Sequence, residues 1–252
     1  IDPDPVAHQP FGIGVQLNCR QVLDEFAGGT DPLRVLAFAF GAGRPCLPLI
    51  SHDAVLESAP ADTRHLIDAA RTHAPGARFV MAGTGNVYNR DAARPALETD
   101  ACSPTLAYPA SKVAAEQVLR DSGLTWSILR LPFVYGDGDG HLASLGALAD
   151  RFGLHPAHTY SVAHHRDVAA VIQLALTGVM DGRTVNVTDD APVTVYEMAQ
   201  LGGNPVAASA EPLTDPWAGR MDGTLLRGFG FRPTVPTIHA ASATSAATRS
   251  EE

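Results

Sequence analysis

The chain has 252 residues, of which 45% are hydrophobic, so it can bury one sizeable core or a core with a small appended lobe. Its formal net charge of −9, without clustered cations, argues against nucleic acid or an anionic membrane surface as a partner. Three cysteines, Cys19, Cys46 and Cys102, are too scattered for a disulfide framework or a zinc site. No apolar run reaches the roughly 18 residues that cross a bilayer and no signal peptide is recognised, so we expect a soluble, cytoplasmic protein.

Short apolar runs alternate with helical patterns along the chain. The pattern predicts strands over residues 33–40, 77–83, 125–136 and 182–188, and helices over residues 53–73 and 167–176. Strands buried on both faces by intervening helices are typical of a parallel sheet. The alternation therefore predicts an α/β fold with crossover connections.

Tyr108 and Lys112 lie four residues apart in a predicted helix, "LAYPASKVAAEQVL", for which Ser103 is the expected N-cap and Pro104 the first residue. This spacing brings a phenol and an ammonium group to one helical face. A nearby cation favours the phenolate and lowers a tyrosine pKa from its ordinary value of about 10. Thr84 ends the preceding strand, at the edge of the sheet where α/β proteins bind ligands.

A plainer interpretation stands beside this one. Tyr108 can be a partly buried aromatic side chain and Lys112 a solvated cation. Thr84 can simply cap the local backbone at the strand end. A tyrosine and a lysine at this spacing are common by chance, so the surrounding segments have to decide between the two interpretations.

Three ordered segments, "FVMAGTGNVY", "ETDACSPTLAYPASKVAAE" and "ILRLPFVYG", resemble the extended short-chain dehydrogenase/reductase family, which includes the nucleotide-sugar epimerases and dehydratases. The resemblance extends from about residue 33 to residue 233. It implies a Rossmann-like, doubly wound parallel sheet with a small C-terminal substrate lobe. We expect a core over residues 1–135 that lacks its first strand–helix–strand unit, a mixed lobe over 136–240 and a disordered tail over 241–252.

The resemblance also implies roles for individual residues and an NAD or NADP cofactor. Tyr108 would be the general acid/base, Lys112 would bind the nicotinamide ribose, and Thr84 would hydrogen-bond the reacting carbonyl or hydroxyl. The residues expected near the cofactor are Ala39, Phe40, Tyr108, Lys112 and Pro132, and those expected near the substrate are Thr84, Asn86, Phe133 and Arg220.

The chain departs from this family at its N-terminal end, where a G-x-x-G-x-x-G turn is expected to hold the cofactor pyrophosphate. Gly12 and Gly14 lack a third glycine, and Pro45 and Pro48 follow the strand over 33–40 where a helix would be needed. Two explanations stay open: the chain is a piece of an ordinary enzyme, or it has lost the dinucleotide site.

The sequence leads to two functional hypotheses. The first is an NAD(P)-dependent oxidoreductase or epimerase that acts on a C–OH or C=O carbon of a sugar nucleotide or a similar polar substrate. The second is a cofactor-independent or non-catalytic binding protein on the same scaffold. Dehydration is disfavoured because Gly85 and Asn86 replace the acidic residues that dehydratases of the family carry after the Ser/Thr. No metal site is expected, since His164 and His165 lack a third ligand at suitable spacing. The resemblance also suggests a homodimer.

Overall fold

The computed structural model describes residues 52–89, 91–136 and 140–242. The strand predicted over 33–40, with Ala39 and Phe40, and the glycines and prolines around it lie outside the described residues. Within the described part, none of the helices is both long and apolar enough to cross a membrane.

A parallel three-stranded sheet forms the centre of the described structure. It contains β1 (Arg78–Thr84), β2 (Thr125–Leu131) and β6 (Arg183–Asn186) in the order β1-β2-β6. α3 (Ala107–Arg120) lies in the connection between β1 and β2, and a longer connection joins β2 to β6, as parallel pairing requires. The predicted α/β sheet is confirmed here.

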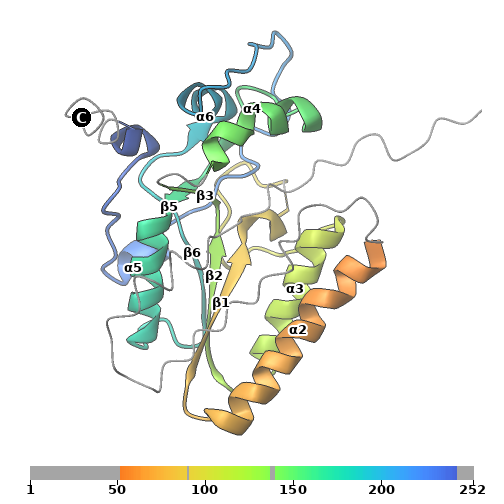
Figure 1. The fold of residues 1–252 in the computed structure, drawn as a ribbon, viewed down its shortest axis with the longest axis vertical. Coiled ribbons are helices and arrows are strands. Elements are labelled where there is room, and N and C mark those ends of the chain that lie inside the picture. The colour runs from red at the N-terminus through yellow and green to blue at the C-terminus, as the bar shows by residue number, and fades with distance from the viewer. Residues whose placement is uncertain (1–51, 90, 137–139, 243–252) are drawn as a thin grey trace, which may run out of the picture.

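Helices cover both faces of this sheet (Figure 1). α2 (His52–His73) packs along α3 (Ala107–Arg120) on one face, and α5 (His165–Leu176) covers the other. The two predicted helices over 53–73 and 167–176 therefore form, with Pro60 accommodated inside α2. Between β1 and α3, a short 3-10 helix, η1 (Gly85–Val87), turns the chain over the carboxyl end of the sheet.

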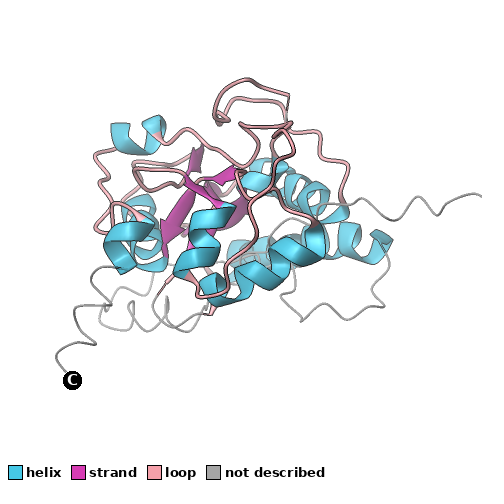
Figure 2. Cartoon of the chain, turned by 90° about the horizontal axis from the view of Figure 1, so that it is seen from above, coloured by secondary structure: helices cyan, strands magenta, loops and turns pink. Residues whose placement is uncertain are grey.

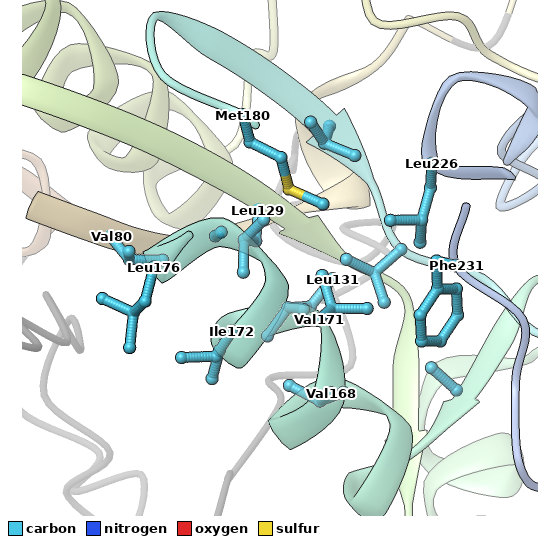
Figure 3. Packing of buried hydrophobic residues seen from close by; sticks show 14 of the residues in the cluster. Val80, Leu129, Leu131, Val168, Val171, Ile172, Leu176, Met180, Leu226 and Phe231 are labelled. Carbon is cyan, nitrogen blue, oxygen red and sulfur yellow. The ribbon is translucent and has the colours of Figure 1, made fainter. Parts of the chain in front are cut away.

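The core between the sheet and α5 explains why the 167–176 pattern folds as it does. Val168, Val171 and Ile172 lie on one face of the helix and are each at most 1% exposed. They pack against Val80 and Leu129 of the sheet, as Figure 3 shows. Burying a side chain of this size contributes about 1.5–3 kcal/mol, so this cluster is a major source of stability.

A second group of elements lies beyond the carboxyl end of the sheet. β3 (Phe133–Tyr135) pairs in parallel with β5 (Val162–His164), and β4 (Thr159–Tyr160) pairs antiparallel with β7 (Val193–Thr194). The helices of this part are α4 (His141–Phe152) and α6 (Val195–Leu201), whereas the short α7 (Thr224–Gly228) packs against the core between the sheet and α5. Seen from above in Figure 2, helices and long loops surround the strands.

Several local expectations are wrong. The Tyr108 helix begins at Ala107, with Leu106 rather than Ser103 as its N-cap, so Pro104 lies outside it. Pro109 takes the position of the early proline instead, which is possible because the first backbone N–H groups of a helix have no intrahelical partner. Pro132 divides the strand predicted over 125–136 into β2 and β3. Residues 241 and 242 are helical, and because residues 243–252 lie outside the described residues, the disordered tail stays a prediction.

Candidate active site

Thr84 is the last residue of β1 and lies at the carboxyl end of the sheet. Its side chain is 2% exposed and caps η1 by accepting a hydrogen bond of 3.3 Å from the backbone N–H of Asn86. This cap is the plainer role that the sequence allows for Thr84. The Thr84 side chain is, however, also close enough to the Tyr108 hydroxyl to lower its pKa.

Tyr108 and Lys112 stand one turn apart in α3, next to the end of β1. The Lys112 ammonium nitrogen lies 5.7 Å from the centre of the Tyr108 ring. Lys112 is 6% exposed, so it is not the solvated cation of the plainer interpretation. Ser111 holds the first turn by donating from its hydroxyl to the Tyr108 carbonyl at 2.8 Å. The structure thus brings Thr84, Tyr108 and Lys112 together.

Burial is the largest influence on the pKa values of Tyr108 and Lys112. It raises the pKa of Tyr108, while the nearby Thr84 side chain acts in the opposite direction. It lowers the pKa of Lys112 to about 8, against the attraction of the Glu116 carboxylate. The expected net lowering of the Tyr108 pKa is therefore not seen, because loss of hydration outweighs it. The phenol is protonated at neutral pH and can donate a proton.

A small cavity of about 20 Å³ lies beside Thr84. Four residues that the sequence places at the cofactor or substrate line it together: Thr84, Asn86, Pro132 and Phe133. Its remaining walls include Tyr160 and Met221, which the sequence analysis did not find. Tyr108 and Lys112 are not among its lining residues, although Thr84, which acts on the pKa of Tyr108, is one of them.

A larger cavity of about 200 Å³ adjoins the small one, since Asn86, Tyr160 and Gly219 line both. Arg220 is in its wall, with its guanidinium 4.7 Å from the ring of Trp217. Leu106 and Pro109, the neighbours of Tyr108, also face it. The cavity therefore connects Arg220 to the end of the sheet, and its cation and aromatic groups can bind a polar, anionic molecule.

The cavity walls that sequence analysis missed come from segments without regular periodicity. Gly219 has a positive φ of 82°, and a side chain there would come within 2.7 Å of the Tyr160 ring. Met221 is 7% exposed and follows directly. An isolated glycine beside Trp217 and Arg220 was the available signal, but nothing in the sequence links it to the end of β1.

An ion pair buried beneath the site joins α3 to the sheet. Glu116 is fully buried, and Arg130 of β2 is 4% exposed. The guanidinium of Arg130 donates to both carboxylate oxygens of Glu116, at 3.1 and 2.8 Å. Gly83 provides the room, because a Cβ there would lie 3.0 Å from a Glu116 oxygen. In the described part of the chain, no group of three or more His, Cys, Asp or Glu side chains is arranged to hold a metal ion.

The model of the NAD-dependent epimerase/dehydratase family matches residues 11–188, which is more than half of the chain. This chain belongs to the NAD-dependent epimerase/dehydratase family. Its resemblance to the extended short-chain dehydrogenase/reductases and its Rossmann-like fold class are thereby confirmed. No curated protein matches the chain in sequence.

Solved structures agree on the fold. A short-chain dehydrogenase/reductase superfamily protein from Agrobacterium tumefaciens with bound NAD is 21% identical and has a TM-score of 0.67, with 92% of this chain and 83% of that one covered. A UDP-galactose 4-epimerase is 21% identical, with a TM-score of 0.63 and coverage of 86% and 78%. RMD from Pseudomonas aeruginosa in complex with NADPH is 18% identical, with a TM-score of 0.66 and coverage of 84% and 79%.

Proposed function

We propose that this protein is an NAD(P)-dependent oxidoreductase or epimerase that acts on a C–OH or C=O carbon of a nucleotide sugar or a similar polar substrate. The observation that carries the proposal is that Thr84, at the end of β1, acts on the pKa of Tyr108 in α3, with the Lys112 ammonium nitrogen 5.7 Å from the Tyr108 ring centre. Membership of the family and the similarity to NAD- and NADPH-bound structures support it.

The residues at the end of β1 fit a nicotinamide dinucleotide. Lys112 is an ammonium group with three donor hydrogens in a buried position, which suits the hydroxyl groups of a ribose. Pro132 lies beside Thr84 at the small cavity, where it would face the nicotinamide ring. When bound, the nicotinamide supplies or accepts the hydride. The raised pKa of Tyr108 keeps its proton available for a substrate carbonyl.

Thr84 and Tyr108 would act on one substrate oxygen. The Tyr108 phenol would give its proton to a carbonyl or, as phenolate, take one from a hydroxyl, and the Thr84 hydroxyl would orient that oxygen. A bound cation close to Tyr108 would favour the phenolate form. Gly85 and Asn86 offer no carboxyl group next to Thr84, so expulsion of a hydroxyl as water is not part of the proposal.

The larger cavity would hold the rest of the substrate. Its wall carries Arg220 beside the Trp217 ring, and a diphosphate is the kind of group that an arginine binds. Asn86 and Phe133 would lie nearer the reacting carbon, because both line the small cavity beside Thr84. This arrangement favours a substrate whose anionic part lies away from the reacting carbon.

Binding and turnover measurements test the proposal. Titration of the chain with NADH and NADPH, followed by fluorescence, should give saturable binding of one of them, and UDP-sugars should be turned over in its presence. If the folded protein binds neither NADH nor NADPH, the enzyme hypothesis is refuted and the binding-protein alternative is favoured. Which of the two nucleotides binds also decides between NAD and NADP as the cofactor.

A tyrosine variant tests the catalytic assignment. Tyr108→Phe should abolish turnover while dinucleotide affinity stays within about twofold, because only a hydroxyl is removed. Tyr196→Phe is the matched control, since Tyr196 is exposed on α6. Retained activity in Tyr108→Phe would contradict the role given to that residue. The proposed homodimer is tested separately by sedimentation of the purified chain.

A further inference from the structure

Asn186 ends β6 and is fully buried below the larger cavity. Its amide oxygen accepts a hydrogen bond of 2.6 Å from the Tyr88 hydroxyl. Its amide nitrogen donates to the carbonyls of Ala96 and Asp222 at 3.0 and 3.1 Å. Both amide hydrogens are thus used on carbonyl groups, which can only accept. The side chain therefore ties three separate segments to the end of the sheet.

Two of these segments pair with each other and form part of the cavity wall. Ala96 donates from its backbone N–H to the Arg220 carbonyl at 2.9 Å, and Asp222 donates to the Ala96 carbonyl at 2.9 Å. Met221, between them, donates to the Ser161 hydroxyl at 2.9 Å. We call residues 220–222 the wall segment. Its position decides where the Arg220 guanidinium and the Met221 side chain stand in the two cavities.

Tyr88 continues the connection towards α3. The Arg130 guanidinium lies 4.8 Å from the centre of the Tyr88 ring, and Arg130 is itself held by Glu116. Glu116 lies one turn after Lys112 in the same helix. Burial raises the pKa of Tyr88 to about 12, so its hydroxyl stays protonated and can donate to Asn186. A continuous series of polar contacts thus runs from the helix of the candidate catalytic residues to the wall segment.

We propose that Tyr88 and Asn186 are positioning residues that hold the wall segment, and with it Arg220, in register with Tyr108 and Lys112. Asn186 is not among the lining residues of either cavity and acts through the residues that it holds. Tyr88 is in the wall of the larger cavity, but its hydroxyl is bonded to Asn186. The inference deepens the proposed function by naming what fixes the anionic end of the substrate relative to its reacting carbon. The inference rests on the proposed function for the identity of the substrate. The contacts of Tyr88 and Asn186 are independent of that function.

The physical reason is that the Asn186 side chain is fully buried, so each of its polar atoms depends on the partner that it has. Removing the Tyr88 hydroxyl leaves the Asn186 amide oxygen buried without its donor, which costs about 1–3 kcal/mol. The amide then gains by turning or shifting, and both wall contacts depend on its orientation. A loosened wall segment changes the position of Arg220 and leaves α3 in place, because Glu116 and Arg130 still fix the helix.

Tyr88→Phe tests the proposal on the full chain, since it keeps the ring against Arg130 and removes only the hydroxyl. Asn186→Asp is the second variant: it keeps an acceptor for Tyr88 and removes both donors to the wall segment. The exposed Tyr196→Phe is the matched control. Calorimetry measures the affinity for UDP, which reports on the Arg220 side of the site, and the affinity for NADH or NADPH, whichever binds, which reports on the Lys112 side. Amide hydrogen exchange at Ala96 and Asp222 measures the wall segment directly.

We expect both variants to bind UDP about tenfold more weakly while dinucleotide affinity stays within about twofold, with faster exchange at Ala96 and Asp222 and unchanged exchange in α3. Equal loss of both affinities would show general destabilisation and overturn the proposal. Unchanged exchange at the two amides would overturn it as well. If the unaltered chain binds no UDP, the nucleotide-sugar function fails, and the exchange data still decide whether Tyr88 and Asn186 hold the wall segment.

Discussion

Glu116→Gln should destabilise the protein by about 3–5 kcal/mol, the loss typical of breaking one buried ion pair. Glu116 is fully buried and Arg130 is 4% exposed, so little water reaches the pair. A glutamine of the same size keeps one hydrogen-bond acceptor but leaves the Arg130 cation without a countercharge. Arg120 also donates to Glu116 at 2.8 Å. Because Arg120 is partly exposed, the loss of this second ion pair adds less to the destabilisation.

Urea-induced unfolding followed by circular dichroism measures this change. Asp68→Asn is the matched control: its pair with Arg71 is 3.3 Å long, both side chains are at least half exposed, and the expected change is within about 0.5 kcal/mol. A loss below about 1 kcal/mol for Glu116→Gln would refute our account of the buried pair. Replacing both partners by apolar residues, as Glu116→Leu with Arg130→Met, should recover part of the loss, because no charge is then left unpaired.

Three further changes follow from the same geometry. Gly83→Ala should destabilise by about 1–3 kcal/mol in urea unfolding, because the new methyl group meets Glu116 at 3.0 Å. Lys112 has a lowered pKa of about 8, so the unfolded chain binds more protons above that pH. Stability should therefore rise by about 2 kcal/mol between about pH 8 and 10 relative to Lys112→Met, and equal pH profiles would contradict this. Gly219→Ala should weaken UDP binding, measured by calorimetry, because its methyl group would displace Tyr160.

Local patterns explain what the sequence could predict. The apolar residues of α5 recur at helical spacing over the whole helix, and β1 is an apolar run with a clear end. The juxtaposition of Tyr108 and Lys112 follows from their spacing in one helix. It was predicted correctly although the predicted start of the helix was wrong, because both residues lie inside the helix. Thr84 could be placed beside them because parallel strands in such folds end at one edge.

Contacts between distant segments explain what it could not predict. Glu116 and Arg130 are each unremarkable in the sequence, and only the packing of α3 on β2 shows that they are paired and buried. The wall segment lies in a region without periodicity, so neither its pairing with Ala96 nor its place beside Thr84 could be inferred. The protonation of Tyr108 also depended on burial, which spacing alone does not give.

The face of the sheet under α3 changes character along its length, and this change locates the site. Met81 and Ile128 stand opposite each other on β1 and β2 and belong to the apolar core with α2 and α3. Two residues further on, Gly83, Arg130 and Asn186 stand in register across the three strands. Successive residues alternate between faces, so this second row points to the same side as the first.

The second row replaces apolar side chains by a gap, a guanidinium and an amide. Glu116 of α3 occupies the space that Gly83 leaves and pairs with Arg130. Tyr88 and the wall segment bond to Asn186. An apolar row at the same place would pack α3 equally well but could not direct hydrogen bonds at specific backbone carbonyls. The polar row is therefore better explained by the need to position the segments above it than by stability, since a buried ion pair gives little net stabilisation over an apolar core.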